Sequence, residues 1–436
     1  MEDISMAFPL RDMVHLDQDL RPWAIRLFDA LQAISHDGVG ISRMTYGKSE
    51  TQAMHLVAER AAAEGLTVEY DAAANLVITL PGERTDLPFV ACGSHLDSVP
   101  VGGNYDGAAG VVAGLMSVVH LQRQGLTPPR TIKVYALRGE ESAWFGQAYL
   151  GSRALFGQFD VADFALPHRD SGLPLETYMR QADADVARLR GGEALVSASE
   201  IACFLELHIE QGPVMVARNF PVGIVTGIRG NHRHRQAQCH GEAAHSGTTP
   251  RWLRRDAVFA VSEFIMRLDR HWQALLEQGQ DVVVTVGILS TNPAAHAMSR
   301  VPEEVRFVLE YRSQSRQVLT EFAQLAGDEA AMLTRLRGVT FDLGEAVLTP
   351  PAVMDTRLIN ALVAICQDAG IAHECLPSGA GHDAAVFANA GVPTAMIFVR
   401  NAQGSHNPHE AMDYDDFFVA AEVLLQGLLS APEALK

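Results

Sequence analysis

The chain has 436 residues, 48% of them hydrophobic and 20% charged, a composition typical of a globular protein that buries a large core. A net charge of −18 argues against nucleic acid or an anionic membrane surface as the main partner. It does not exclude an anionic small molecule, because a local arginine or a metal ion can dominate a pocket. The length predicts two domains rather than one.

The cysteines and the apolar segments indicate in which cellular compartment the protein is expected. The five cysteines are scattered, odd in number and without a C-x-x-C pair, which favours a reducing environment. The segment Met1–Ser5 lacks the basic start and apolar core of a signal peptide. No uninterrupted apolar run reaches membrane-spanning length. We therefore predict a soluble, cytoplasmic protein that acts on a small-molecule substrate, with neither nucleic acid nor a membrane as partner.

Helical and strand patterns alternate along the chain in a βαβ order. This order predicts an α/β fold, in which a mixed, mostly parallel sheet is covered by helices. The predicted helices cover residues 21–35, a segment that follows Ser49–Thr51 and runs to about Glu64, and residues 110–120. The predicted strands cover residues 66–71, 75–80, 87–92, 131–137 and 393–399, together with a strand that begins at Phe204 and ends in polar residues.

The order of predicted strands and helices changes between about Gly227 and Pro350. This segment has the order β-α-β-β-α-β, which forms a self-contained two-layer α+β unit. The predicted boundaries are residues 1–226 and 350–436 for the larger domain and residues 227–349 for the inserted domain. Within the insert we predict strands over 233–239, 282–289, 305–312 and 339–343, with helices over 256–277 and 316–337.

The stretch Ala91–Gly110 carries the first candidate metal ligands. His95 and Asp97 are two residues apart at the end of a buried strand, so their side chains project to the same side. A carboxylate beside an imidazole fixes the orientation of a metal-binding histidine. Asp106 follows two glycines in a loop that can return a second carboxylate toward His95. The alternative interpretation is an ordinary strand–turn–helix with a solvated aspartate.

Two adjacent carboxylates, Glu140 and Glu141, follow the strand over residues 131–137. Neighbouring side chains point to opposite sides, so one can ligate a metal while the other acts as general base toward water. Open α/β sheets place their chemistry at the carboxyl ends of strands, which favours this function over a solvated acidic turn. His208 ends a further strand, where a lone histidine is more often structural.

Seven short motifs occur in one order along most of the chain, from about residue 20 to residue 425. Together they resemble the dinuclear metal amidohydrolases that include N-carbamoyl-L-amino-acid hydrolases, β-ureidopropionase and allantoate amidohydrolase, relatives of the aminoacylase and carboxypeptidase G peptidases. The motifs are His95-Leu-Asp97, Asn104-Tyr-Asp106-Gly, Glu140-Glu141, His208-Ile-Glu-Gln-Gly, His245-Ser-Gly-Thr-Thr-Pro, Gly381-His-Asp-Ala and Ser405-His406-Asn-Pro-His-Glu410.

The resemblance implies a site for two divalent metal ions per chain. Asp106 would bridge the two ions, with His95 and His208 completing one site and Glu141 and His406 the other. Glu140 would be the general base that takes a proton from the water between the metals. Zinc is the expected metal, with manganese, cobalt and nickel as alternatives, because imidazole and carboxylate ligands suit all four.

The resemblance also assigns a role to the inserted domain. His245 would donate a hydrogen bond to the developing oxyanion, and in many relatives it reaches the site of the other subunit. The insert is therefore expected to act as a lid and dimerisation domain of a homodimer. Judged alone, His245 would be a surface or packing residue. Three further residues are expected to support the pocket rather than to bind metal: Asp97, His382 and Asp383.

Three residues are expected to contact the substrate. Gln211 matches a residue that lies near the ureido group in the family. Arg312 matches the arginine that holds the substrate carboxylate, a natural bidentate contact, although it could also be an exposed strand-end charge. Ser299 stands where family members usually have the asparagine that assists this arginine. Serine keeps a hydrogen-bonding group but shortens its reach, which leaves open which carboxylate is bound and whether the substrate carries one there.

These features predict a metal-dependent hydrolase of linear amide or ureido C–N bonds, with an N-carbamoyl amino acid or a related ureido acid such as allantoate as substrate. The alternative within the same fold is an N-acyl-amino-acid hydrolase or a dipeptidase. The alternative of a different class is a non-catalytic, metal-free binding protein. The complete ligand set and the intact Glu140 argue against that last alternative.

Overall fold

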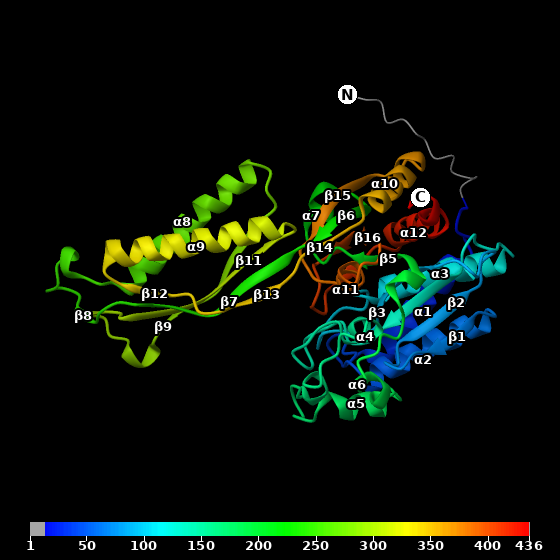
Figure 1. Cartoon of the computed structure of the whole chain (residues 1–436), viewed down its shortest axis with the longest axis horizontal. Helices are drawn as coiled ribbons and strands as arrows, with labels where there is room; N and C mark the ends of the chain where they lie inside the picture. Colours follow the sequence, from blue (N-terminus) through cyan, green and yellow to red (C-terminus); the bar gives the residue numbers. More distant parts are fainter. Residues whose placement is uncertain (1–13, 436) are drawn as a thin grey trace. The chain divides into compact units, whose positions relative to one another are not determined.

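The computed structural model describes residues 14–435. The segment Met1–Ser5, on which the prediction about a signal peptide rests, lies outside the described residues. The chain divides into two compact units (Figure 1): residues through Thr226 together with those from Val353 onward, and residues Gly227–Ala352. The second unit ends at Ala352, three residues later than the predicted 349.

The larger unit is organised around a mixed sheet whose central strands are parallel. Strand β3 (Phe89–His95) pairs in parallel with β4 (Ile132–Leu137) and with β5 (Ile201–Ile209), and β5 pairs in parallel with β16 (Thr394–Val399). All four are apolar runs that the sheet buries. The predicted mixed, mostly parallel sheet is therefore confirmed. The order is β1-β2-β4-β3-β5-β16-β6-β14, with β15 beside β6, where β1 is Thr67–Tyr70, β2 Leu76–Leu80, β6 Val222–Ile228, β14 Ala352–Val353 and β15 His373–Ser378.

Helices pack on both the sheet and one another. The helix α3 (Ala108–Arg123) is apolar all round, and residues 108–121 are buried between the sheet and α12 (Tyr414–Ala434). Asp413 caps α12 by accepting a hydrogen bond from Asp415 N. The other helices of this unit are α1 Leu20–Ser35, α2 Lys48–Ala63, α4 Leu150–Leu155, α5 Leu175–Gln181, α6 Val186–Arg190, α7 Val214–Arg218, α10 Thr356–Asp368 and α11 Asp383–Asn389, and a small ribbon is formed by β17 Asn401–Ala402 and β18 Ala411–Met412.

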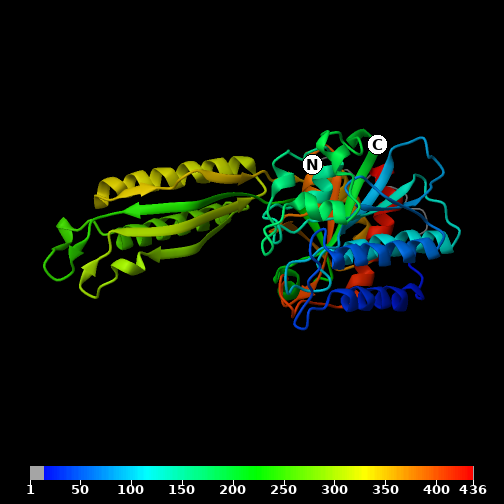
Figure 2. The same cartoon turned by 90° about the horizontal axis from the view of Figure 1, so that it is seen from below.

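The second unit is an antiparallel sheet covered on one face by two long helices, as predicted for a two-layer unit. Along the central strand β11 (Glu304–Ser313), alternate residues from Val305 to Tyr311 are buried against the helices, which is the period of a half-buried strand. The helices α8 (Ala257–Glu277) and α9 (Arg316–Arg337) run side by side on this face (Figure 2). The remaining strands are β7 Gly230–His240, β9 Val283–Thr291, β12 Thr340–Asp342 and β13 Ala346–Thr349, with a separate ribbon of β8 Ala244–His245 and β10 Arg300–Val301.

The histidines of β7 need one correction. The sequence suggests that His232, His234 and His240 share a polar strand face. His234 is instead buried, and its Nδ1 atom lies 3.0 Å from the carbonyl oxygen of Leu343. The pairing of β7 with β11 shifts its register between His234 and Ala237. An extra residue at such a shift reverses which face of the sheet the following side chains occupy, so His234 and His240 lie on opposite faces. Among residues 14–435 no helix is long and apolar enough to cross a membrane.

Candidate metal centre

The candidate ligands gather at one edge of the sheet because three neighbouring parallel strands end there. His95 is the last residue of β3, Glu140 and Glu141 follow β4, and His208 lies near the end of β5. The strand order β4-β3-β5 brings these three carboxyl ends together. Asp106 joins them from the loop before α3.

A first group of possible metal ligands consists of His95, Asp106 and His208, all buried. The Nε2 atoms of His208 and His95 lie 3.2 Å and 3.6 Å from Asp106 Oδ1. The two Nε2 atoms are 3.4 Å apart. Each Nδ1 atom lies close to a backbone carbonyl oxygen, that of Asp97 for His95 and that of Ile209 for His208. If each Nδ1 donates to that carbonyl, both Nε2 atoms present lone pairs, as metal-binding imidazoles do.

A second group consists of Asp106, Glu141 and His406. His406 Nε2 lies 3.2 Å from Glu141 Oε1 and 3.4 Å from Asp106 Oδ2. Asp106 thus presents one oxygen to each group, which is the arrangement that a carboxylate bridging two cations requires. His406 adopts a left-handed backbone conformation with φ 59°, which non-glycine residues rarely do outside functional sites.

The donor set fits divalent cations. Asp106 Oδ1 is buried and accepts no hydrogen bond of good geometry from any residue in the range 14–435. Burial opposes charge on His95, but the carboxylates of Asp106 and Asp97 outweigh it and hold the pKa of His95 well above its usual value. Contacts with Asp106 and Glu141 raise the pKa of His406 to about 11. The carboxylates therefore draw positive charge into this cavity, and a bound cation would supply it.

Glu140 lies beside both groups without belonging to either. Its Oε2 atom is 3.9 Å from His95 Nε2, and its backbone N–H donates to Asp97 Oδ1 at 3.0 Å. Burial, assisted by the neighbouring charge of Glu141, raises the pKa of Glu140 well above the usual value, although His95 opposes the rise. A buried carboxylate with a raised pKa is a stronger base than a solvated one, as general-base catalysis requires.

Asp97 anchors the two strand ends to each other. Its carboxylate accepts hydrogen bonds from the backbone N–H groups of Glu140 and Glu141 and from Thr45 Oγ1. Its Oδ1 atom also lies 3.3 Å from His95 Nδ1. The structure therefore places Asp97 beside His95, as the sequence suggests, and adds a second task, since Asp97 orients the backbone that carries the paired glutamates.

Gly107 leaves the space that the imidazole ring of His95 occupies. This residue has φ +67°, and a Cβ added to it would lie 2.5 Å from three ring atoms of His95. Only glycine combines this conformation with this close approach.

Gln211 directly follows β5 and Glu210 in a left-handed conformation with φ 61°. Its Nε2 donates to Asp106 Oδ2 at 2.8 Å, while its Oε1 is buried and has no hydrogen-bond partner among the described residues. The predicted substrate contact therefore adjoins the carboxylate shared by the two ligand groups.

Glu206 is a buried acid that the motifs miss. It forms a third possible group with His208 and His382. Both oxygens of Glu206 are occupied, one by Ser94 Oγ and the other by Ala384 N, each at 2.7 Å. This pairing indicates that Glu206 supports the pocket from behind. The alternation of β5, which puts Glu206 and His208 on one face, is the signal that could have found it.

His382 and Asp383 begin α11 behind the same pocket. The His382 ring packs against His208 at 4.4 Å between centroids, and His382 Nε2 lies 2.9 Å from Ser378 Oγ. Asp383 accepts from Ser152 Oγ at 2.5 Å. These contacts agree with the expected supporting role.

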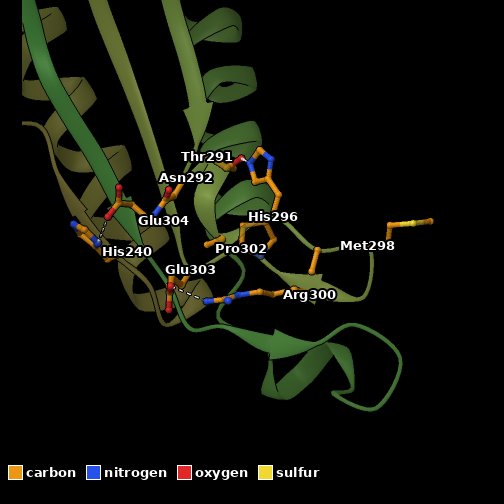
Figure 3. Close-up of a pocket in the computed structure, with 12 residues that line it drawn as sticks. His240, Thr291, Asn292, His296, Met298, Arg300, Pro302, Glu303 and Glu304 are labelled. Atoms are coloured by element: carbon orange, nitrogen blue, oxygen red, sulfur yellow. Dashed lines mark hydrogen bonds and ion pairs between the residues drawn. The ribbon is translucent and has the colours of Figure 1, made fainter.

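The remaining predicted residues lie in the second unit. His245 is exposed on β8, and its Nδ1 accepts hydrogen bonds from the backbone N–H groups of Gly247 and Thr248. Ser299 is next to it, because Ser246 N donates to Ser299 O and Arg300 pairs with His245. The loop that carries Ser299 also walls a concavity of about 540 Å³ (Figure 3), whose lining includes His240 and the charged side chains of Arg300, Glu303 and Glu304.

Arg312 lies at the opposite end of this unit from Ser299. It pairs with Asn231, close to where the chain enters the insert, and its Nε donates to Glu310 Oε1 at 2.6 Å. The strand β11 separates Arg312 from the β8–β10 ribbon by ten residues, or about 30 Å. Within one chain, Ser299 and Arg312 therefore do not meet.

Comparison with known proteins agrees with this geometry. The model of Peptidase family M20/M25/M40 matches residues 91–430. The chain belongs to this family. It is accordingly a hydrolase of a metal-dependent group, and every candidate metal ligand of the larger unit lies within the matched residues.

Two relatives and one solved structure illustrate the likeness within family M20/M25/M40. The chain is 34% identical to the N-carbamoyl-L-amino acid amidohydrolase of Geobacillus stearothermophilus, over 93% of this chain and 97% of the relative. It is 30% identical to the allantoate amidohydrolase of Escherichia coli, over 88% and 91%. A crystal structure of a hydantoinase/carbamoylase family amidase from Burkholderia multivorans aligns with a TM-score of 0.86 at 26% identity, covering 96% of this chain and 98% of that one.

Proposed function

We propose that this enzyme hydrolyses the C–N bond of a linear N-carbamoyl or ureido acid. The observation that carries the proposal is Asp106, which presents one oxygen to His95 and His208 and the other to Glu141 and His406. The names of relatives that align along nearly the whole chain support the substrate class, since they act on N-carbamoyl-L-amino acids and on allantoate.

Two divalent cations fit the ligand groups, one at His95, Asp106 and His208 and one at Asp106, Glu141 and His406, with zinc as the first candidate and manganese, cobalt or nickel as alternatives. Such ions, when bound, polarise a carbonyl group and lower the pKa of water. Glu140 accepts the proton of the attacking water and returns it to the leaving nitrogen. Asp97 holds the backbone of Glu140 and Glu141 in register for these separate roles.

Gln211 favours a ureido substrate over an acyl substrate. Its Oε1 is buried, adjoins the metal centre and lacks a partner in the described chain. A ureido group ends in an NH₂ that can donate to such an acceptor, whereas the alkyl end of an acyl group cannot. A buried acceptor left unpaired is costly, which gives discrimination between the two groups.

A substrate panel tests this proposal. We expect ammonia release from N-carbamoyl-L-amino acids or from linear ureido acids such as allantoate, with N-acetyl amino acids and dipeptides cleaved at least about 100-fold less efficiently. Ammonia is measured directly, and amine release is measured in parallel for the acyl substrates and dipeptides. Efficient cleavage of the acyl compounds with no ammonia from any ureido acid would instead establish the N-acyl-amino-acid hydrolase or dipeptidase alternative.

We also propose that the enzyme acts in the cytoplasm as a homodimer formed through the insert. All five cysteines are unpaired, which suits a reducing compartment. The edge strand β9 exposes Ile288 and Leu289 at 59% and 54%, an apolar edge that a second copy can cover. The separation of Arg312 from Ser299 and His245 supports sharing between subunits, because one chain cannot bring all three to one small molecule.

His245 suits the role of oxyanion donor. Two backbone N–H groups donate to its Nδ1, so the neutral imidazole carries its proton on Nε2 and can donate from there. We expect His245→Ala to lower turnover by roughly 10²–10³-fold, the usual effect of losing such a donor, without loss of metal. Turnover and elemental analysis check this expectation.

Mixing two inactive variants tests whether each site is shared. A mixed dimer of His245→Ala and Glu140→Gln chains contains one site with both lesions and one with neither, so activity should reappear if His245 acts across subunits. Verified subunit exchange without recovery would place the action of His245 within its own chain.

A further inference from the structure

Tyr149 is a residue of the larger unit that the motifs and the mechanism above leave unused. It precedes α4 in a left-handed backbone conformation, with φ 61° and ψ 35°. A tyrosine adopts this conformation rarely, and residues that do so cluster at functional sites. This conformation sets the direction in which the Tyr149 side chain leaves the backbone.

The backbone around Tyr149 is bound to the segment that carries the general base. Tyr149 N donates to Glu140 O at 3.0 Å, Leu150 N to Gly139 O at 2.8 Å, and Gly151 N to Arg138 O at 2.7 Å. Three successive N–H groups thus bind three successive carbonyl oxygens in the reverse direction. This ladder fixes the backbone of Tyr149 against the segment of Glu140.

The phenol hydroxyl reaches the turn before α11. A Cβ added to Gly381 would lie 1.7 Å from Tyr149 Oη, so the absence of a side chain at Gly381 makes room for the hydroxyl. The hydroxyl therefore lies between the segment of Glu140 and the turn that leads to His382 and Asp383. Burial and then the charges of Glu140 and Asp383 raise the pKa of Tyr149 well above its ordinary value. The phenol remains neutral at physiological pH and can donate a hydrogen bond.

This donor has no hydrogen-bond partner among the described residues. The side chain of Tyr149 is half-buried. Tyr149 Oη makes no hydrogen bond to any other residue in the range 14–435, whereas the hydroxyl of the buried Tyr46 donates to Ala73 O at 3.0 Å. The nearby Asp383 Oδ2 is buried and likewise unpaired within the described chain. A fixed donor beside a general base, with its hydrogen bond unused, is suited to a ligand.

We infer that Tyr149 is a catalytic residue whose hydroxyl donates a hydrogen bond to the oxygen of the scissile carbonyl. This inference rests on the proposed C–N hydrolysis, in which that oxygen becomes an oxyanion when water adds to the carbonyl carbon. The larger unit then carries a donor of its own, in addition to His245 from the insert. The proton stays on Tyr149, and Glu140 remains the group that transfers protons.

The test compares Tyr149→Phe with Tyr178→Phe. The first variant removes only the hydroxyl and keeps the ring. The second removes a hydroxyl that lies 2.8 Å from Ser171 Oγ, in a cluster packed around His168, and serves as the matched control. Each variant is assayed for kcat, KM, metal content and thermal unfolding. Substrate affinity is measured by calorimetry with the Glu140→Gln substitution added to slow turnover.

We expect Tyr149→Phe to lower kcat by roughly 10²-fold, the lower end for loss of one oxyanion donor, with unchanged substrate affinity, metal content and unfolding temperature. Tyr178→Phe should retain wild-type kcat. A kcat within about twofold of wild type for Tyr149→Phe would overturn the inference, as would a fall in kcat accompanied by loss of metal or of thermal stability. Weaker substrate binding at unchanged kcat would also overturn it, because the contact would then be to a non-reacting group.

The failure of this inference is distinguishable from failure of the proposed function. The ratio of wild-type to Tyr149→Phe turnover is measured on whichever panel compound the wild type hydrolyses, acyl or ureido. The activity of the wild type on the panel decides the substrate class. The ratio of wild-type to Tyr149→Phe turnover decides the role of the hydroxyl.

Discussion

Glu140→Gln should lower turnover by roughly 10²–10⁴-fold while the protein keeps its metal, because the substitution removes a base and none of the five proposed ligands. Glu140 is buried next to His95 but belongs to neither ligand group. Glutamine has the same shape and keeps the backbone N–H that donates to Asp97. The measurement is kcat together with metal content by elemental analysis.

The control for this variant is Glu59→Gln on α2, which removes an exposed carboxylate and should leave turnover unchanged. Near-normal turnover of Glu140→Gln would show that another group serves as the base. Loss of metal from Glu140→Gln would show that Glu140 is a ligand, and the roles of Glu140 and Glu141 would have to be exchanged.

Removal of metal should abolish turnover, with a fall of more than about 100-fold, since polarisation of the substrate carbonyl by cations is worth several kcal/mol. The unfolding temperature should fall as well, because a ligand that binds only the folded state stabilises it. The experiment treats the enzyme with a chelator, verifies the loss by elemental analysis, and restores zinc, manganese, cobalt or nickel one at a time.

The number of metal ions bound per chain tests the two ligand groups separately. We expect up to two ions per chain for the wild type and one fewer for His406→Ala, which loses a ligand of the Asp106–Glu141 group alone. Glu206→Gln is the matched control, because both oxygens of Glu206 already accept hydrogen bonds within the protein. Full activity of a sample shown to be free of metal would contradict the proposed chemistry.

Much of the architecture follows from local patterns in the chain. Short apolar runs such as Phe89–Cys92 and Ile132–Leu137 lie in buried parallel strands, as their length and composition predict. In the insert, Asp256 and Ser315 cap the two long helices at the predicted starts. These features depend on residues near one another in sequence, so periodicity and capping reveal them.

The kind of site is likewise visible in the sequence, since imidazoles and carboxylates stand where strands end. Their individual roles came from the order of the motifs and not from spacing. Spacing could not show that Asp106 faces two groups, because His406 and His208 reach it from distant parts of the chain. It also could not show that Ser299 and Arg312 lie at opposite ends of β11.

Local patterns in the chain predict the α/β architecture, the inserted unit and the chemical type of the site, because strand-end residues and helical periods involve residues that are close in sequence. Which groups face one another depends on how the folded chain brings distant segments together. Glu206 has a supporting role because its two oxygens accept hydrogen bonds from Ser94 and Ala384. Tyr149 is held against Glu140 by backbone hydrogen bonds, and its hydroxyl lies close to Gly381. These pairings depend on the packing of separate strands and loops, which no local pattern encodes.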